Sequence, residues 1–380
     1  MNTREVYITK ISKFLPNNPV SNDDMEDYLG LVKGSKSRSK NLILRNNGIK
    51  TRYYALDKNG NSTHTNAEIA AEAVKGLFTN GFQKEDIQLL TCGTGSPDQM
   101  VPSHASMIQG ALKCNPIEVL TAGGTCNSGM LALKYSYMSI LTGMVSNSVC
   151  VGSEKTSAWL RSENFEEEAE HLEKLGANPY IAFEREFLRW MLSDGASAVL
   201  LNDTPNKDGI SLRIDWIENK SYANELKTCM YAGGIKNQSG ELIPWREIPQ
   251  KEQQEKSVFA LQQDTKELEH TITKYGGIFL SEVCKKYNFK PSDIDFFLPH
   301  MSSEFFRKKI IEDSNKQGLP IADEKWFTNL HKVGNVGAAS AFLMLEELFN
   351  EGRFKKGQKI LIMVPESARF SYTYTFLTVV

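Results

Sequence analysis

The sequence predicts an α/β fold built in layers from two similar halves. Short apolar runs alternate with helical patterns, which is typical of layered α/β proteins. Residues 82–90 (FQKEDIQLL) are echoed by residues 289–297 (FKPSDIDFF), each reading as a helix end, a turn and a strand. Cys126 and Asn335 each open an apolar, small-residue helix at nearly the same separation. Two echoes at one separation indicate an internal duplication.

Apolar periodicity and turn residues place the individual elements along the chain. Asn66 is a plausible N-cap for the first long helix. In chain order we expect a strand near residues 1–8, a helix over 67–79, a strand over 87–93, a helix over 128–141, strands over 147–152 and 196–201, and a helix over about 257–287.

The duplication divides the chain into an N-terminal half, residues 1–203, and a C-terminal half, residues 204–380. Residues 204–256 have the character of a strand-and-loop link into the second half. An insertion at about residues 162–190 begins with the acidic run 162–174, SENFEEEAEHLEK. Such a run favours a solvated helix or a lid over the site, with a recognition patch as the alternative.

Composition narrows the classes of function. The 380 residues are 41% hydrophobic and 24% charged with a formal net charge of −2, which is ordinary for a soluble globular protein and gives no argument for a nucleic-acid partner. The six cysteines include no CxxC pair, which suits a reducing compartment. The start lacks the apolar block of a signal peptide, and no apolar run is long enough to span a membrane. We therefore expect a cytoplasmic protein.

The most informative stretch is TAGGTCNSG, residues 121–129, in which Cys126 follows a glycine turn and precedes an apolar helix. Only the thiolate of a cysteine attacks well, and a helix N-terminus lowers the pKa of a thiol through its unpaired N–H groups. Gly123 and Gly124 permit the tight turn, and Gly129 lets the helix approach its neighbours closely. We interpret Cys126 as a nucleophile, and the other five cysteines as structural.

Two polar residues of the second half complete the candidate site. His300 follows the apolar run Phe296–Pro299, so it emerges at a strand end, where α/β proteins place reactive groups. His331 is the alternative candidate for the imidazole of the site. Asn335 lies between glycines, where asparagine is by default a turn residue. An imidazole and an amide together could hold one thioester carbonyl and stabilise the charge that develops on it.

The sequence lacks the motifs of metal, phosphate and dinucleotide sites. The chain has no HExxH, no paired Cys/His spacing and no GxxxxGK[ST], so we expect neither a metal site nor a nucleotide phosphate site. Gly93-Thr94-Gly95 reads as a loop, because no third glycine and helix follow at the spacing of a dinucleotide fingerprint.

These motifs, in this order, resemble the thiolase-fold condensing enzymes, most closely the β-ketoacyl-[acyl carrier protein] synthase III group. The likeness covers nearly the whole chain. The segments that show it are Asn47-Gly48-Ile49-Lys50-Thr51-Arg52, Val101-Pro102-Ser103, the Cys126 turn, Ser193-Asp194-Gly195-Ala196, Leu298-Pro299-His300 and Gly334-Asn335-Val336-Gly337-Ala338-Ala339-Ser340.

The resemblance implies a five-layer αβαβα fold of two duplicated halves and a homodimer. It implies that Cys126 takes an acyl group from a thioester carried on the phosphopantetheine of an acyl carrier protein or coenzyme A, with no resident cofactor. His300 and Asn335 would then polarise a second thioester, whose carbon nucleophile attacks the acyl-cysteine. The backbone N–H groups of Cys126 and Ala368 would form the oxyanion hole.

The chain departs from the family at the substrate-binding positions. The C-terminal loop reads Pro365-Glu366-Ser367-Ala368-Arg369-Phe370 where the family is glycine-rich, and we expect Ser367 to contact substrate. Asn46 replaces an arginine that often contacts coenzyme A, which favours carrier-bound acyl groups. Val101 replaces a bulky aromatic that caps the acyl pocket of the partner subunit, which predicts room for a longer chain.

These departures favour a specialised ketosynthase. The overall pattern, including the residues GGTCNSG around Cys126, is similar to the ketosynthases of dialkylresorcinol and flexirubin-type pathways. In those pathways a β-ketoacyl unit is joined to a second acyl thioester, and ring closure gives a cyclohexanedione. The first alternative is an initiating synthase that joins a short acyl-coenzyme A to malonyl-carrier protein. Two others are acyl transfer to an oxygen or nitrogen nucleophile and a non-catalytic partner subunit. The intact His–Asn pair opposes the former, and the retained Cys126 opposes the latter.

Overall fold

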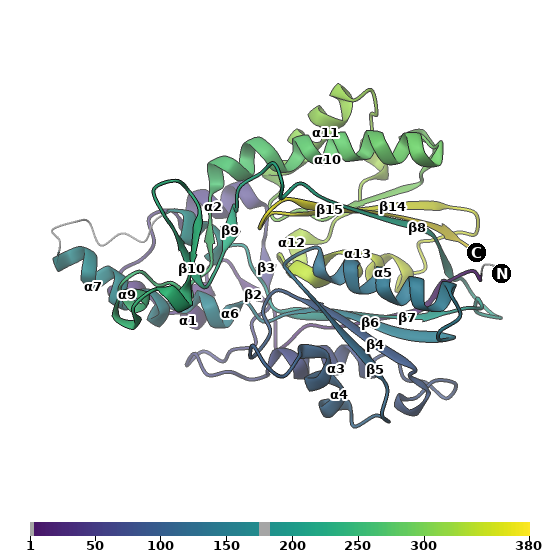
Figure 1. Cartoon of the computed structure of the whole chain (residues 1–380), viewed down its shortest axis with the longest axis horizontal. Coiled ribbons are helices and arrows are strands. Elements are labelled where there is room, and N and C mark those ends of the chain that lie inside the picture. The colour runs from purple at the N-terminus through teal and green to yellow at the C-terminus, as the bar shows by residue number, and fades with distance from the viewer. Residues whose placement is uncertain (1–3, 175–182) are drawn as a thin grey trace.

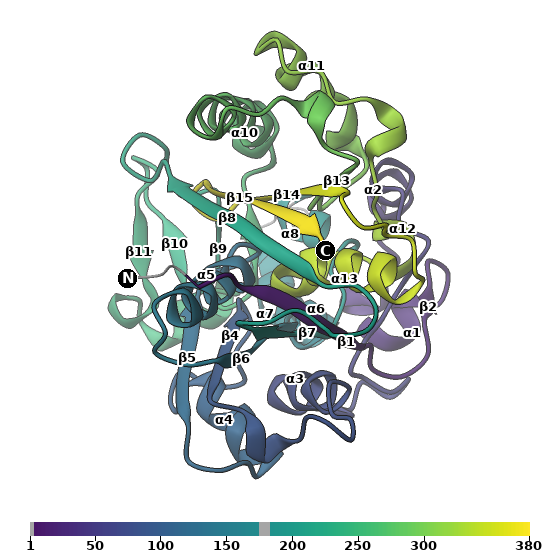
Figure 2. The ribbon, with the colours of Figure 1, turned by 90° about the vertical axis from the view of Figure 1, so that its right-hand side faces the viewer.

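The protein, as a computed structural model, is described over residues 4–174 and 183–380, and its main strands form a sheet in the order β13-β14-β15-β8-β1-β7-β6-β4-β5. These strands are β1 (Tyr7–Phe14), β4 (Leu89–Thr94), β5 (Glu118–Gly123), β6 (Asn147–Glu154), β7 (Gly195–Asn202), β8 (Leu212–Ser221), β13 (Phe296–Pro299), β14 (Lys359–Glu366) and β15 (Ser371–Val379). β1 and β8 pair over two residues, Tyr7 with Arg213 and Ile8 with Leu212. The sheet bends there into two half-sheets, one above the other (Figure 2).

Helices cover both half-sheets and fill the space between them (Figure 1). The outer and middle helices are α3 (Asn66–Lys75) and α4 (His104–Leu112) below, α5 (Ser128–Leu141) and α13 (Ser340–Asn350) in the middle, and α10 (Thr265–Tyr287) and α11 (Phe305–Lys316) above. The five αβαβα layers confirm the predicted thiolase-like fold. Strands up to Asn202 form the lower half-sheet and strands from Leu212 the upper one, while the boundary at 203/204 stays a prediction.

The middle layer is the most deeply buried part of the fold. Most residues of α13 are buried, including Phe342 and Leu345, because the helix has a half-sheet on each side. Gly129 of α5 lies so close to the backbone carbonyl of Ala338 that a Cβ would clash with it. The predicted close approach of this helix is therefore confirmed, and it brings the two halves together next to the nucleophile.

Most predicted elements match the structure, but several boundaries differ. Strand β1 runs over Tyr7–Phe14 where residues 1–8 were expected, and helix α3 ends at Lys75 where residue 79 was expected. Helix α3 is capped by Thr65 and not by Asn66, because Thr65 and Glu68 form a reciprocal capping box. Helix α10 begins at Thr265 and not near residue 257, because the preceding segment pairs as a strand and Asp264 caps the helix.

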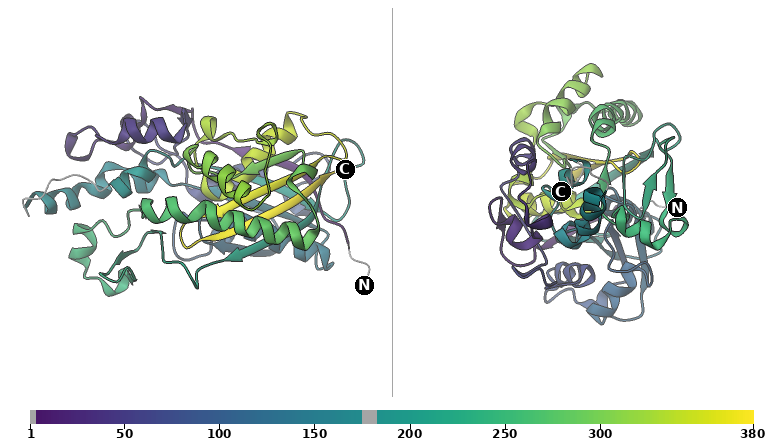
Figure 3. Two further views of the ribbon diagram at one scale, coloured as in Figure 1. Left: turned by 90° about the horizontal axis from the view of Figure 1, so that it is seen from above. Right: turned by 90° about the vertical axis from the view of Figure 1, so that its left-hand side faces the viewer.

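Most of the other elements gather at one end of the layers, at the left of Figure 1 and in Figure 3. They are β2 (Val20–Ser21), α1 (Met25–Leu29), η1 (Val32–Gly34), α2 (Lys40–Asn47), β3 (Thr51–Arg52), α6 (Ser157–Leu160), η3 (Ser162–Phe165), α7 (Glu166–Lys174), α8 (Phe183–Arg189), β9 (Met230–Tyr231), β10 (Gly234–Lys236), β11 (Leu242–Pro244), α9 (Gln250–Glu255), β12 (Gln262–Gln263) and α12 (Leu330–Val333).

The acidic run is helical, as predicted, in η3 and α7. Residues 175–182 of the expected insertion lie outside the described residues. No helix in the described part of the chain is both long and apolar enough to cross a bilayer.

Candidate active site

A cavity of about 210 Å³ lies between the two halves, and the three residues singled out from the sequence, Cys126, His300 and Asn335, all line it. Much of the remaining wall is apolar. It is supplied mainly by α8, α10 and α11 and by strand β14: Leu188, Leu192, Leu268, Ile272, Ile310 and Met363. The site therefore combines a few converging polar groups with an apolar lining, which is the usual composition of a small-molecule pocket.

Cys126 lies in the turn between β5 and α5, and the C-terminal strands hold this turn from both sides. The hydroxyl of Thr125 donates to Glu366 Oε1 at 2.6 Å. On the other side of the cysteine, Asn127 donates to Ser371 Oγ at 3.0 Å and accepts from Thr373 at 2.6 Å. Gly124 has φ of 136°, a conformation that favours glycine. Cys126 is thus fixed by residues far away in sequence.

The expected low pKa of Cys126 is not found. Burial, together with the carboxylates of Glu366 and Glu154, raises the pKa of this thiol well above its ordinary value. The low-dielectric surrounding is the main cause, and the nearby carboxylates disfavour the thiolate further. The raised pKa therefore favours the protonated thiol at neutral pH.

His300 follows β13 directly, and its side chain is 2% exposed. Its backbone N–H donates to the carbonyl of Met363 at 2.8 Å, which fixes the residue to the neighbouring strand β14. Its Nε2 has no hydrogen-bond partner among the described residues. Burial lowers the pKa of His300 to about 4, so the imidazole is neutral at pH 7. The competing residue His331 is exposed and does not line the cavity.

Asn335 is held so that its amide donor stays available. Its Oδ1 accepts the N–H of Gly337 at 3.0 Å, whereas Nδ2 makes no hydrogen bond within the described ranges. Its backbone bonds to Met191 at 3.0 Å and to Ser193 at 2.9 Å. Since the oxygen is engaged, the amide presents its NH₂ group as the free function.

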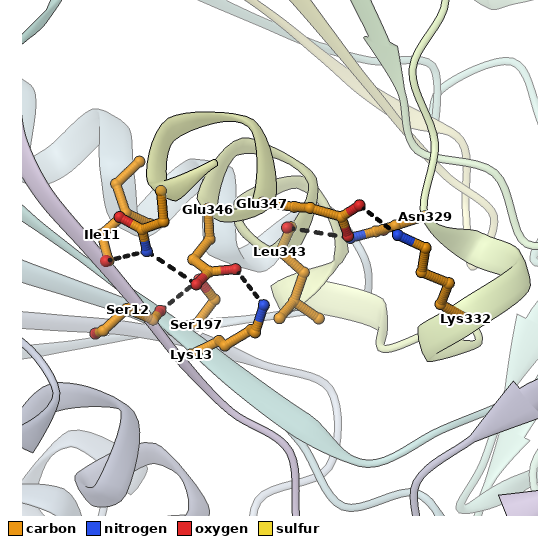
Figure 4. A network of polar contacts seen from close by, with 10 residues as sticks. Ile11, Ser12, Lys13, Ser197, Asn329, Lys332, Leu343, Glu346 and Glu347 are labelled. Atoms are coloured by element: carbon orange, nitrogen blue, oxygen red, sulfur yellow. Dashed lines mark hydrogen bonds and ion pairs between the residues drawn. The ribbon is translucent and has the colours of Figure 1, made fainter. Parts of the chain in front are cut away.

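The segment before Asn335 is anchored by α13 (Figure 4). Glu347 forms an ion pair with Lys332 at 2.7 Å and accepts from Asn329 at 3.2 Å. The preceding residue of the same helix, Glu346, pairs with Lys13 of β1 at 2.7 Å. The helix that follows Asn335 therefore fixes α12 in front of it, and the loop between them holds the amide at the cavity wall.

In the C-terminal loop, Ser367 lines the cavity as expected, whereas the N–H of Ala368 is already hydrogen-bonded. Ser367 lines the cavity, where its hydroxyl lies 3.9 Å from the sulfur of Met230. The backbone N–H of Ala368, the expected oxyanion donor, instead donates to the Glu366 side chain. In this structure that donor is occupied, so its oxyanion role stays a prediction that requires the Glu366 carboxylate to move.

The two other expected substrate residues lie outside this cavity. Asn46 is exposed and lines a second cavity of about 230 Å³, which shares Leu268 and Phe306 with the first. Val101 is 82% exposed and lines neither of these two cavities of its own chain. A capping role for Val101 therefore requires a second subunit.

Glu154 is a cavity residue that the sequence analysis missed. It ends β6, is 2% exposed, and accepts the N–H groups of Gly95 at 3.0 Å and Ala338 at 3.1 Å as well as the hydroxyl of Ser96. Burial raises its pKa to about 7. The available signal was a lone carboxylate after the apolar run Val149–Gly152. It ties strands β4 and β6 of the first half to the segment that follows Asn335 in the second.

Comparisons with known proteins agree with this architecture. Residues 284–365 match the family of 3-oxoacyl-[acyl-carrier-protein] synthase III C-terminal regions. A β-ketoacyl-[acyl-carrier-protein] synthase III of Clostridium perfringens is 27% identical over 351 residues, covering 92% of each chain. Together with the structural likenesses below, these matches relate the chain to the ketosynthase III-like condensing enzymes.

Two solved structures show the same fold. AbyA1, a tetronic acid condensing enzyme, superposes with a TM-score of 0.77 at 19% identity, covering 98% of this chain and 99% of AbyA1. Xanthomonas campestris OleA, solved with bound lauric acid and lauroyl-CoA, superposes with a TM-score of 0.73 at 17% identity over 98% and 99% of the two chains.

Proposed function

We propose that this protein is a ketosynthase that forms a carbon–carbon bond between an acyl group on Cys126 and a second acyl thioester. One observation carries the proposal. His300 Nε2 is buried and without a hydrogen-bond partner among the described residues, and Asn335 lines the same cavity with only its Oδ1 engaged, so that both side chains offer a nitrogen to the space that Cys126 lines. Two such donors are what an enolate oxygen requires, and each contributes a few kcal/mol where charge develops in a site without water.

The first step loads the acyl group. The sulfur of Cys126 attacks the thioester carbonyl, the carbon–sulfur bond to the carrier breaks, and the proton of the cysteine thiol ends on the departing pantetheine thiol. The raised pKa of Cys126 favours this coupled transfer over a free thiolate. In this proposal the backbone N–H of Cys126 donates to the oxyanion.

The second step forms the carbon–carbon bond. The neutral imidazole of His300 and the NH₂ of Asn335 donate to the carbonyl oxygen of the second thioester. Loss of CO₂, or of a proton from an acidic β-ketoacyl unit, leaves an enolate on that thioester. Its α-carbon attacks the acyl carbon and the bond to Cys126 breaks. The released sulfur regains a proton, either the one lost from the β-ketoacyl unit or, where CO₂ was lost, one from water.

We further propose that the substrates belong to dialkylresorcinol or cyclohexanedione-type secondary metabolism, with a β-ketoacyl thioester as the second substrate. The apolar lining and the small Val101 support long acyl groups. The alternative is an initiating β-ketoacyl synthase III that uses a short acyl-coenzyme A and malonyl-carrier protein. The names of the curated relatives favour that alternative.

The substrates would arrive on the phosphopantetheine of an acyl carrier protein, with no resident cofactor. The cavity beside Asn46 adjoins the catalytic one and supports this position as the mouth for the pantetheine arm. We propose a homodimer as well. Strand β5 lies at the edge of the sheet with both ends exposed, and an unpaired edge strand is a ready template for pairing. The partner would then supply Val101.

A panel of acyl groups tests the proposal. Purified protein is offered acyl-carrier proteins and acyl-coenzyme A species of increasing length, and intact-protein mass spectrometry records the mass added to Cys126. Malonyl- and β-ketoacyl-carrier proteins are then added, and the products are identified. If long acyl chains load and the β-ketoacyl-carrier protein gives a cyclised product, the result supports a ketosynthase of dialkylresorcinol or cyclohexanedione-type metabolism. Loading of short acyl-coenzyme A with a β-ketoacyl product from malonyl-carrier protein supports the alternative.

A further inference from the structure

Trp159 lines both the cavity that contains Cys126 and a groove on the outside of the molecule. It is a half-buried residue of the short helix α6, which directly follows strand β6 and Glu154. Its side chain lines the cavity that contains Cys126. The same residue lines a second hollow of about 410 Å³ where η3 and α7 meet α9. Trp159 is the residue that these two spaces share.

The groove beyond Trp159 is amphipathic. Its floor next to the tryptophan is apolar, with Val258 and Ala260 buried and Phe259 partly exposed. Its rim is polar and is formed by the acidic insertion and by α9: Glu163, Asn164, Glu167, Gln250, Gln253 and Gln254. An apolar floor can receive methylene groups, while the polar rim keeps the groove from being a hydrophobic patch on the surface.

We propose that Trp159 is a specificity-determining residue that limits the length of the acyl chain carried by Cys126. This inference rests on the proposed function. The indole ring is the partition on which the far end of the chain stops. A tryptophan side chain fills more space than any other, so its removal joins the cavity to the groove and lets further methylene groups continue over Val258 and Ala260.

The test uses Trp159→Ala and saturated acyl-N-acetylcysteamine thioesters of increasing length, which require neither a carrier protein nor coenzyme A. Loading rates are followed by intact-protein mass spectrometry. For chains longer than the wild-type limit, the rate with Trp159→Ala rises by about fourfold for each methylene group newly accommodated. The readout is the ratio of the variant rate to the wild-type rate as a function of chain length, which stays constant up to the wild-type limit and rises beyond it.

Two further variants serve as controls. Phe259→Ala removes an aromatic ring from the groove but not from the cavity, and it leaves the chain-length profile unchanged. Trp159→Phe keeps an aromatic partition and shifts the limit less than Trp159→Ala does. If Trp159→Ala fails to fold, Trp159→Leu takes its place in the same comparison.

The outcomes separate this inference from the proposed function. A wild-type protein that loads no thioester contradicts the proposed function. A wild-type protein that loads normally, with an identical length profile for the alanine variant, overturns the role of Trp159 alone. A crystal structure of the folded alanine variant in which cavity and groove remain separate also overturns it, independently of activity.

Discussion

The hydroxyl of Thr125, the residue before the nucleophile, donates to the carboxylate of Glu366 in the C-terminal loop at 2.6 Å. The same carboxylate accepts the N–H of Ala368 and the hydroxyl of Ser371. One side chain thus connects the turn that carries Cys126 to the loop expected to complete the oxyanion hole, and it places a negative charge near the thiol.

Replacing this charge is expected to activate the thiol. Glu366→Gln keeps an oxygen that accepts from Thr125 but removes the charge that raises the pKa of Cys126, so that pKa falls. At pH 7 the rate of alkylation by iodoacetamide rises by about threefold or more, since the thiolate is the reacting form. Glu72→Gln, on helix α3, is the control and leaves the rate unchanged. An unchanged rate in Glu366→Gln would show that desolvation alone sets the reactivity.

Cys126→Ala is expected to abolish acyl loading, because the covalent bond forms at this sulfur. The measurement is the mass of the intact protein after incubation with an acyl thioester. Cys114→Ala is the matched control, since Cys114 is half-buried and does not line the cavity. A normal mass increase in Cys126→Ala would place the nucleophile elsewhere.

Asn335 is expected to act after loading. Asn335→Ala still acquires the acyl group, but product formation falls by about 10²–10³-fold, because one donor to the developing enolate is lost. Asn335→Asp preserves the size of the side chain while replacing the NH₂ by an acceptor oxygen, so it fails to condense as well. Full product formation in the aspartate variant would mean that Asn335 only shapes the loop.

Acidification is expected to destabilise the protein through its buried histidines. His104 is buried beside Ser153, and its pKa is lowered to about 4 by burial. Between the unfolded pKa near 6.5 and the folded one, the unfolded chain binds a proton that the native state does not, so stability falls as pH falls. From pH 7 to pH 5 this costs about 2 kcal/mol for His104.

Urea unfolding of wild type and His104→Gln at both pH values isolates this contribution. The comparison between proteins is needed because Glu154, whose pKa is raised to about 7, acts with the opposite sign: its contribution to stability rises as pH falls from 7 toward 4.5. The pH-dependent loss should be about 2 kcal/mol smaller in the variant. Equal losses in the two proteins would contradict a neutral buried His104.

The contact between the two halves gives a prediction about stability. Gly129→Ala places a Cβ against the carbonyl of Ala338, and the clash destabilises the protein by about 1–3 kcal/mol. Gly110→Ala is the control. Gly110 lies inside helix α4 with open space around it, so alanine there stabilises the helix by about 0.5–1 kcal/mol. The midpoint of urea unfolding measures both, and a neutral Gly129→Ala would show that α5 can shift away.

Much of the fold was predictable because its strands and helices carry local signals. The boundaries of α5 and the helical nature of the acidic run follow from periodicity and composition. The start of α10 could not be predicted in this way. The short strand β12 before it forms only because it pairs with β9, and no local sequence pattern specifies that pairing.

Some residues of the candidate site could likewise be predicted from the sequence, and others could not. Cys126, His300 and Asn335 each stand out beside a glycine turn or at a strand end, and all three line one cavity. Glu154 and Glu366 could not be linked to Cys126 from the sequence, because their carboxylates approach it only when β6 and β14 are packed against the turn.

The order of apolar and polar residues was by itself enough to determine a duplicated α/β fold and a set of three candidate reactive groups, since periodicity and turn chemistry are local properties. Only the tertiary structure decided the protonation state of the thiol, the free nitrogens of His300 and Asn335, and the sharing of Trp159 by the cavity and the groove. Those properties depend on desolvation, on distant charges and on which hydrogen bonds are already occupied, and all three arise only when segments far apart in the chain are packed together.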